Sequence, residues 1–316
     1  MMQYIFRRIL MAIPLLIGIT ILSYAIIRLA PGGPTALLID PSIKPQDLAK
    51  MEEKFGVNDP IYVGYIKWVG DLVQGDFGTS YIKRGTPVSE LIWNRLPNTI
   101  LLMVSSTLIA AIIAIPFGIY SAMRPYSLLD YSATFVSFVG VATPNFWLGI
   151  MLIMYLAVQW SIFPTGGVMT IGADFSIWDR LHHLILPAFV LAVSDTAALT
   201  RYTRSSMLDV LKQDYIRTAK SKGFKERKVV IKHGVRNGMI PIITMFGLMI
   251  PSFIGGAAVT EKIFSWPGIG QLFIDSAYQR DYPVIMGLTV ISAVLVVIGN
   301  LIADILYAIC DPRIEY

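Results

Sequence analysis

Long apolar stretches recur along this chain and are the first feature of its sequence. A helix needs about 20 predominantly apolar residues to cross the hydrocarbon core of a membrane. Six stretches come close to that length or exceed it with almost no charged residue. They are Ile9–Ile27, Thr99–Met123, Tyr131–Phe163, Leu184–Thr200, Gly238–Thr260 and Tyr282–Ala303. The pattern predicts an all-α membrane protein with six transmembrane helices.

The third stretch is too long for one straight helix. Pro144 and Asn145 lie near its middle, and a proline inside a helix removes a backbone hydrogen bond and clashes with the preceding turn. The pair predicts either a kinked helix or a helix followed by a segment at the membrane interface.

The first stretch follows Arg7 and Arg8 as a secretory signal would, but it is long enough to span and no cleavage pattern follows it. We therefore expect a retained first helix.

Basic residues between the apolar stretches predict the orientation in the membrane. The segment Arg201–Arg236 holds eleven lysines and arginines against three acidic residues, and such an excess is typical of the cytoplasmic side. Arg7 and Arg8 place the N-terminus on the same side. An even number of crossings then predicts that both termini are cytoplasmic. It also places Ala30–Asn98 outside, where its length and apolar clusters predict a small folded cap.

Composition narrows the classes of function. Hydrophobic residues make up 55% of the 316 residues and charged residues only 15%, too few to cover a soluble domain of this size. The formal charge of +5 lies mainly between the spans, so we interpret it as an orientation signal and expect no nucleic-acid partner. Cys310 is the single cysteine, which excludes an intrachain disulfide and a cysteine-based metal cage. We expect neither a metal site nor a catalytic residue.

The basic segment contains a short helix with both ends marked. Asp214 can cap the first turn, where a negative charge also suits the positive end of the helix dipole. Lys220 and Lys222 suit the negative end, and Gly223 can adopt the positive φ that often ends a helix. This spacing predicts a helix over Asp214–Gly223, and we name this range the coupling segment.

One face of the coupling segment could fit into a groove of a partner protein. That face combines small side chains with one aromatic anchor, at positions three or four residues apart. It consists of Tyr215, Thr218, Ala219 and Lys222. On spacing alone, a solvated basic loop that merely follows the charge bias of membrane proteins is an equally good interpretation.

A resemblance to a known family favours the functional interpretation. The run from Asp214 through Pro241, with His233, Arg236-Asn237 and Met239-Ile240-Pro241, resembles the coupling loop of binding-protein-dependent ABC importer permeases of the dipeptide, oligopeptide and nickel group. Further stretches in the same order are similar to this group, and to the first of its two permease subunits. They include Pro31-Gly32-Gly33-Pro34, Gly75-Asp76-Phe77-Gly78-Thr79-Ser80, Arg95-Leu96-Pro97-Asn98-Thr99, Thr143-Pro144-Asn145-Phe146-Trp147, Phe163-Pro164-Thr165-Gly166-Gly167, Phe264-Ser265-Trp266-Pro267-Gly268-Ile269-Gly270, Arg280-Asp281-Tyr282-Pro283 and Asp311-Pro312-Arg313.

The chain departs from the broader permease family at two points, of which one is a distance from Gly223 to Pro241 that is longer than in sugar importers. At the other point, the broader family often has Glu-Ala-Ala where this chain has Arg217-Thr218-Ala219. Both differences concern the detailed docking contacts rather than the role of the segment.

The resemblance implies a fold and a division of the chain. The fold is the type I ABC importer permease fold of six transmembrane helices, with a small extracytoplasmic segment between helices 1 and 2. The implied parts are the first helix at 1–30, the extracytoplasmic segment at 31–98, a type-1 permease domain with helices 2–6 at 99–308, and a cytoplasmic tail at 309–316. The coupling loop covers about 201–238.

The resemblance also implies partners and a mechanism in the bacterial cell membrane. Two ATP-binding subunits hold ATP and Mg, a second homologous permease completes the path, and an extracytoplasmic substrate-binding protein docks outside. This chain carries no cofactor and lies in membrane lipid. The implied ATPase-coupling residues are Asp214, Tyr215, Arg217, Thr218, Ala219, Lys220, Lys222 and Gly223. The sequence agrees with this division, because it contains no G-x-x-x-x-G-K followed by Ser or Thr, the phosphate loop of ATPases.

Four residues are candidates for the translocation path. Asp195 lies within the fourth span, where a charged carboxylate costs roughly 2.5 to 3.5 kcal/mol and must face water or a partner. It could meet the amino group of a peptide, or it could make an interhelical hydrogen bond, which we favour. The other candidates are Asn145 beside the predicted kink, and Gly255 and Gly256 near the outer end of the fifth span, where small residues allow close helix contact or a wide pore mouth.

Three alternatives remain. Nickel or other small-solute permeases share the same motifs, although this chain has no ligand cluster for a metal. A stand-alone secondary transporter would be expected to carry coupling charges in several helices, and only Asp195 lies deep in one. A membrane enzyme could use His182 and His183 with Asp179. Neighbouring residues on a helix point about 100° apart and chelate poorly, so we interpret these as residues of a helix start.

Overall fold

The computed structural model describes residues 2–29, 59–83, 85–249 and 257–310. Regular structure in this part of the chain is helical, apart from one isolated bridge between Thr79 and Pro87. These residues form two compact units. One contains the described residues before Asn98 together with 269–298, and the other contains 98–268 with the last turns of the final helix.

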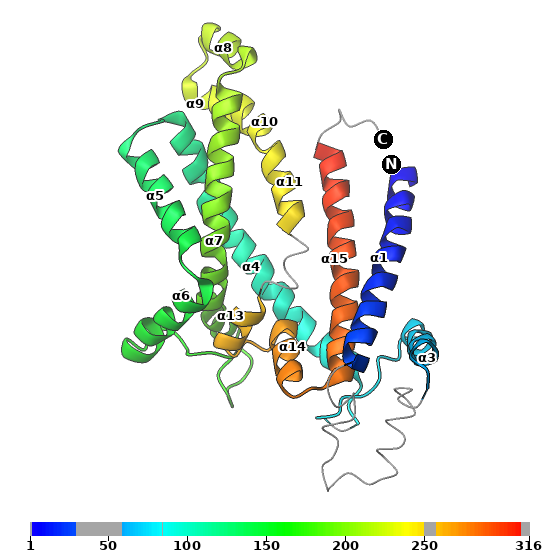
Figure 1. The fold of residues 1–316 in the computed structure, drawn as a ribbon. Coiled ribbons are helices and arrows are strands. Elements are labelled where there is room, and N and C mark those ends of the chain that lie inside the picture. Colours follow the sequence, from blue (N-terminus) through cyan, green and yellow to red (C-terminus); the bar gives the residue numbers. More distant parts are fainter. Residues whose placement is uncertain (1, 30–58, 84, 250–256, 311–316) are drawn as a thin grey trace. The chain divides into compact units, whose positions relative to one another are not determined.

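The first unit is built on the helix α1 (Met2–Leu29) and the first part of α15 (Tyr282–Cys310). Between them in sequence come α3 (Ile61–Val73) and α14 (Ile269–Tyr278) (Figure 1). A cluster of buried aromatic and aliphatic residues joins α1 to α15. Its members are Tyr24, Ile27, Tyr81, Tyr282 and Met286, with Tyr65 and Trp68 of α3 packed against them.

The loop before α4 is fixed to the start of α15 by one carboxylate. Asp281 is buried and accepts hydrogen bonds from the Ser80 hydroxyl, from the Tyr81 N–H at 3.1 Å and from the Ile82 N–H at 3.4 Å. Burial raises the pKa of the Tyr81 hydroxyl, and the nearby Asp281 carboxylate raises it further. Tyr81 therefore stays neutral and adds no charge to the cluster. The predicted folded cap is thus seen in part, in α3 and this loop.

The second unit contains the two longest helices. They are α4 (Val88–Met123), whose first turns belong to the first unit, and α7 (Ile177–Leu211). At 1.5 Å per residue each is about 50 Å long, whereas the hydrocarbon core is about 30 Å thick. The helix α4 begins before Thr99, where its apolar stretch begins, and α7 continues beyond Thr200, where its apolar stretch ends. Polar residues extend both helices beyond the apolar stretch, because a helix already started adds residues at little cost.

The third apolar stretch is broken, as Pro144 and Asn145 predicted. The helix α5 (Leu128–Ala142) is followed by α6 (Asn145–Leu152) and the π-helical η1 (Ile153–Gln159), and the direction changes by 97° at the break. Figure 1 shows α6 leaving the end of α5 at this steep angle. The stretch does not form one straight span, and its second half is turned across the first.

Four of the described helices are long and apolar enough to cross a membrane, and the bent pair makes up to five. The four single helices are α1, α4, α7 and α15. The predicted fifth span begins as α11 (Ile240–Met249), and its central residues lie outside the described ones. Its predicted end at Thr260 falls instead in a separate short helix, α13 (Ala258–Ile263).

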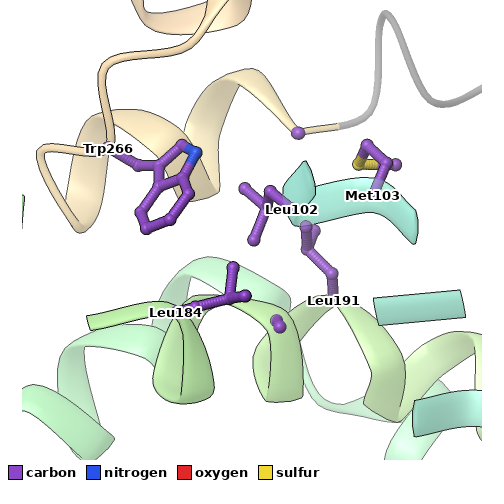
Figure 2. Close-up of a cluster of buried hydrophobic side chains, with 7 residues drawn as sticks. Leu102, Met103, Leu184, Leu191 and Trp266 are labelled. Carbon is purple, nitrogen blue, oxygen red and sulfur yellow. The ribbon is translucent and has the colours of Figure 1, made fainter. Parts of the chain in front are cut away.

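A buried tryptophan organises the core of the second unit. Trp266, in the loop after α13, packs with Leu102 and Met103 of α4 and Leu184 and Leu191 of α7 (Figure 2). Its indole N–H also donates to the backbone carbonyl of Asn98 at 3.0 Å. A buried indole needs such a partner. The Phe264–Gly270 motif singled out in the sequence is therefore part of the packing around α4 and α7.

Candidate coupling segment and transport path

The coupling segment forms a short helix directly after α7. The helix α8 (Asp214–Ser221) begins where Gln213 interrupts the helical conformation, with φ −71° and ψ 152° (Figure 1). Gln213 is thus the N-cap, without a side-chain hydrogen bond, and the prediction that Asp214 caps the helix is wrong. Asp214 is the first helical residue, where its charge still suits the helix dipole. Its carboxylate lies 3.6 Å from Arg217 Nη1.

The end of α8 is as predicted. Gly223 has a φ of 79°, a conformation that costs little for glycine alone. Its N–H donates to the carbonyl of Lys220 at 2.9 Å, and the Lys222 N–H donates to that of Thr218 at 3.1 Å. The backbone therefore turns sharply after Lys222, and this turn depends on glycine.

The inner face of α8 differs from the prediction. Ile216 is 1% exposed and Ala219 is 6% exposed, and both pack against Val229 and Leu211. The prediction that Ala219 belongs to the exposed face is therefore wrong. Ile216 is the most apolar side chain of α8, and position 219 lies on the same side because the two are three residues apart. The sequence places Ile216 and Ala219 on one side of the helix but does not show that Val229 and Leu211 cover that side.

The outer face of α8 is polar and basic, with one aromatic side chain. Tyr215 is 42% exposed, and Thr218 and Lys222 are exposed beside it. Lys220 Nζ lies 3.8 Å from Glu226 Oε1, an exposed ion pair of the kind that contributes little to stability. The face thus offers a ring, a hydroxyl and several cations to a partner with acidic groups.

The end of α7 that carries α8 is packed against the next chain segment. This segment consists of α9 (Glu226–Val229), the π-helical η2 (Val230–Val235) and α10 (Arg236–Gly238). A Cβ atom on Gly238 would lie only 2.5 Å from Met207 Sδ, so any side chain here would displace the buried Met207 side chain. The Ser206 hydroxyl donates to the Gly238 carbonyl at 2.8 Å. The coupling segment is therefore held on both sides by α7 and by the chain that follows.

The four path candidates are not brought together by the described structure. Asp195 lies in α7, half-buried, on the same face as Ala192 and Leu199, and within the described residues its carboxylate makes neither a hydrogen bond nor an ion pair. Asn145 begins α6 at the bend. Gly255 and Gly256 lie outside the described residues. The path role of all four stays a prediction.

His182, His183 and Asp179 hold a loop in place. Asp179 accepts hydrogen bonds from the N–H and hydroxyl of Thr170, both at 2.7 Å. His182 Nε2 lies 2.7 Å from the Ile162 carbonyl, and His183 Nδ1 lies 3.0 Å from the Gly166 carbonyl. Within the described residues no group of three metal-ligating side chains occurs. The helix-start interpretation fits this geometry, because each polar side chain meets a backbone partner of the loop.

A solved structure with the same arrangement of helices identifies the fold. The chain resembles a subunit of the MetNI methionine ABC transporter in an inward-facing conformation, with a TM-score of 0.51 and 13% sequence identity. The match covers 69% of this chain and 97% of that one. At this identity the likeness concerns the fold alone, which is the type I ABC importer permease fold predicted from the sequence.

Sequence comparison then gives the family. Residues 114–316 match the family described as binding-protein-dependent transport system inner membrane component. Residues 1–103 match the family that describes the N-terminal part of the membrane component of such systems. The chain belongs to this family of multi-pass membrane proteins.

Relatives along the whole chain agree with this assignment. The oligopeptide transport system permease protein AppB of Bacillus subtilis is 66% identical, with 100% of both chains covered. The dipeptide transport system permease protein DppB of Alkalihalophilus pseudofirmus is 39% identical, again over 100% of both chains. That of Escherichia coli K12 is 36% identical over 100% of this chain and 99% of its own.

Proposed function

We propose that this chain is the permease subunit of an ATP-driven importer of oligopeptides or dipeptides. The observation that carries the proposal is α8: a short helix, anchored through Ile216 and Ala219, that presents Tyr215 and a basic face at the end of α7. A short helix that packs on the end of a long helix of the bundle, as α8 packs on Leu211 of α7, can transmit a displacement to that helix. The role of Asp214–Gly223 is to receive that displacement from an ATPase subunit.

The energy for transport comes from other chains. Two ATP-binding subunits hold ATP and Mg, and this chain carries no cofactor of its own. The absence of a phosphate loop from the sequence supports this division. A second homologous permease completes the path, and an extracytoplasmic binding protein delivers the substrate. Membership of a binding-protein-dependent family supports the need for such partners.

The proposed location is the bacterial cell membrane, with both termini and α8 on the cytoplasmic side. The excess of lysine and arginine over Arg201–Arg236 supports this orientation. Peptides are the proposed substrate class because relatives named as oligopeptide and dipeptide permeases align along the whole chain. If liposomes that contain the complete complex take up labelled nickel but no labelled peptide, the substrate is nickel instead.

Reconstitution of the complete complex tests the proposal. We expect ATP-dependent uptake of labelled peptides into liposomes that contain the complex, with the binding protein and ATP on opposite sides. Gly223→Pro should abolish most of this uptake while ATP hydrolysis continues, because proline fixes φ near −65° and lacks the N–H that bonds the Lys220 carbonyl. The measurement is the number of peptides taken up per ATP hydrolysed.

Gly75→Pro provides the matched control, since Gly75 also has a positive φ of 86° but lies in the predicted extracytoplasmic segment. We expect this variant to retain the wild-type ratio of uptake to hydrolysis in whatever complex assembles. Uptake by the purified chain alone, without ATP or companions, would contradict the proposal. So would a Gly223→Pro complex with the ratio of the wild type.

A further inference from the structure

An ion pair between a buried aspartate and a half-buried arginine joins α5 to α7 near the end of α7 that carries α8. Asp130, in the first turn of α5, is 3% exposed. Arg204 of α7 donates to both carboxylate oxygens, from Nε to Oδ1 at 2.6 Å and from Nη2 to Oδ2 at 2.8 Å. Such a two-pronged contact fixes the direction of the guanidinium plane as well as its distance. The pair therefore fixes the orientation of one helix against the other.

The same carboxylate holds the turn that leads from α4 into α5. The Tyr126 N–H donates to Asp130 Oδ2 at 2.9 Å. Tyr126 has a φ of 65°, which is unfavourable for a residue with a Cβ atom and needs such support. The Ser127 hydroxyl accepts from the Asp130 N–H at 3.3 Å and caps α5. Asp130 thus links a strained turn, a helix start and α7.

The rest of the contact between α5 and α7 includes a close approach at Gly140, where an added Cβ atom would lie 3.3 Å from Val193 Cγ1 and 3.4 Å from Ala197 Cβ. Among the described helices, α7 is the one with extensive contact to α5. An apolar cavity of about 310 Å³ opens between α4, α5 and α7, with Phe117, Val136 and Phe189 in its lining. In lipid, apolar helix faces gain nothing from the hydrophobic effect when they associate, so polar contacts carry more of the specificity. The ion pair is therefore the contact that fixes the register of α5 on α7.

A continuous set of contacts connects this pair to the coupling segment. Arg204 lies one turn before Met207, and Met207 packs with Val230 and with Leu211. Leu211 in turn contacts the cluster of Ile216, Ala219 and Val229 that anchors α8. A displacement of α8 consequently reaches Met207 through side chains in contact, and Arg204 lies one turn away on the same helix.

We propose that Asp130 and Arg204 are positioning residues that make α5, and the bent α6 after it, move as one body with α7 when α8 is displaced. Neither residue touches nucleotide or substrate in this role; they act through the helices that they join. The inference rests on the proposed function, because it assigns the pair a part in transmitting force from the ATPase. Without the pair, α7 moves and α5 lags behind.

The first experiment measures coupling in the reconstituted complex. Asp130→Asn keeps the shape of the side chain and removes its charge, and we expect uptake per ATP hydrolysed to fall about fivefold or more, the lower range of known coupling effects. Arg204→Lys keeps the charge but loses the two-pronged contact, and we expect an intermediate loss. Asp59→Asn is the control, since it removes an exposed ion pair with Lys67, at 2.6 Å, in the other unit.

The second experiment measures the joint movement directly. Cysteines replace two exposed residues, Tyr131 of α5 and Tyr202 of α7, and Cys310→Ser removes the native thiol. Each new cysteine then carries a spin label. With the ion pair intact, we expect the same distance distribution in nucleotide-free complexes and in complexes trapped with ATP and vanadate. In Asp130→Asn we expect a broader distribution that differs between the two states. A purely structural role would lower stability in the variant without making the distance depend on nucleotide.

Each outcome decides between the two proposals. If Gly223→Pro uncouples the complex but Asp130→Asn keeps both the ratio and the distances of the wild type, this inference is overturned and the proposed function stands. A distance that changes with nucleotide while the pair is intact also overturns it. If ATP and companion subunits have no effect on uptake, the proposed function falls and this inference with it. Should Asp130→Asn fail to assemble, Arg204→Lys takes its place in both experiments.

Discussion

Small residues decide how closely α4 and α7 approach one another. Ala110 and Ala114 of α4 are fully buried, and Gly118 continues their spacing of four residues. A Cβ atom on Gly118 would lie 2.6 Å from Thr203 Cβ and 2.9 Å from the Thr200 carbonyl oxygen. These distances are too short for any side chain. Small residues four apart allow close helix contact, and the structure shows that α7 is the partner helix at Gly118.

A first prediction follows for Gly118→Ala. The added methyl group must push α4 away from Thr200 and Thr203, and overpacking of this kind typically costs about 1 to 3 kcal/mol, so we expect a loss of stability in that range. The measurement is the midpoint of thermal unfolding of the detergent-purified chain. Gly18→Ala in α1 is the matched control, because nothing lies within 4 Å of the place that its added methyl group would take. A midpoint in Gly118→Ala equal to that of Gly18→Ala would contradict the close approach.

At the scale of the element, α8 is a small amphipathic unit with its apolar side turned inward. The end of α8 could be read from the sequence, because Gly223 acts through local backbone geometry, whereas the start is set by Gln213 and not by the Asp214 cap that was predicted. Which side of α8 faces inward could not be read from the sequence, because it depends on Val229 and Leu211, which approach only after the chain has folded back. The basic side chains that the sequence singled out are those left on the outside.

A second prediction concerns Ile216→Asp. A carboxylate at this position would be buried against Val229 and Leu211 without a partner, so α8 should detach from them. We expect trypsin to cleave after Arg217, Lys220 and Lys222 at least about tenfold faster than in the wild type, since burial of an isoleucine contributes more than about 1.4 kcal/mol. Tyr215→Asp, at the neighbouring exposed position, is the control and should leave the cleavage rate unchanged. Equal rates in the two variants would show that Ile216 does not anchor α8.

At the scale of the whole molecule, the chain combines long helices with one sharply broken one. The helix α7 continues to Leu211, beyond the end of its apolar stretch at Thr200, and the coupling segment follows this extension. The 97° change of direction between α5 and α6 turns the third apolar stretch away from a simple crossing. Both features affect where the loops lie with respect to the membrane.

A third prediction tests the orientation of these loops. Ile171 is fully accessible and lies between η1 and α7. We expect Ile171→Cys, introduced together with Cys310→Ser, to react with a membrane-impermeant maleimide in intact cells. Thr218→Cys in α8 should react only after the membrane is opened, because the positive-inside rule places it in the cytoplasm. The measurement is the labelled fraction with and without permeabilisation. Labelling of Thr218→Cys in intact cells would contradict the cytoplasmic position of the coupling segment.

The sequence by itself determined the helical membrane class, the break at Pro144 and a short helix within Asp214–Gly223 that stops at its glycine. These features follow from hydrophobicity, from backbone chemistry or from the order of neighbouring residues, all of which act locally. The tertiary structure alone decided the inward face of α8, the burial of Trp266 and the pairing of Asp130 with Arg204. Each of these joins residues far apart in the chain, and a periodic pattern of apolar residues does not specify which distant side chain will meet which.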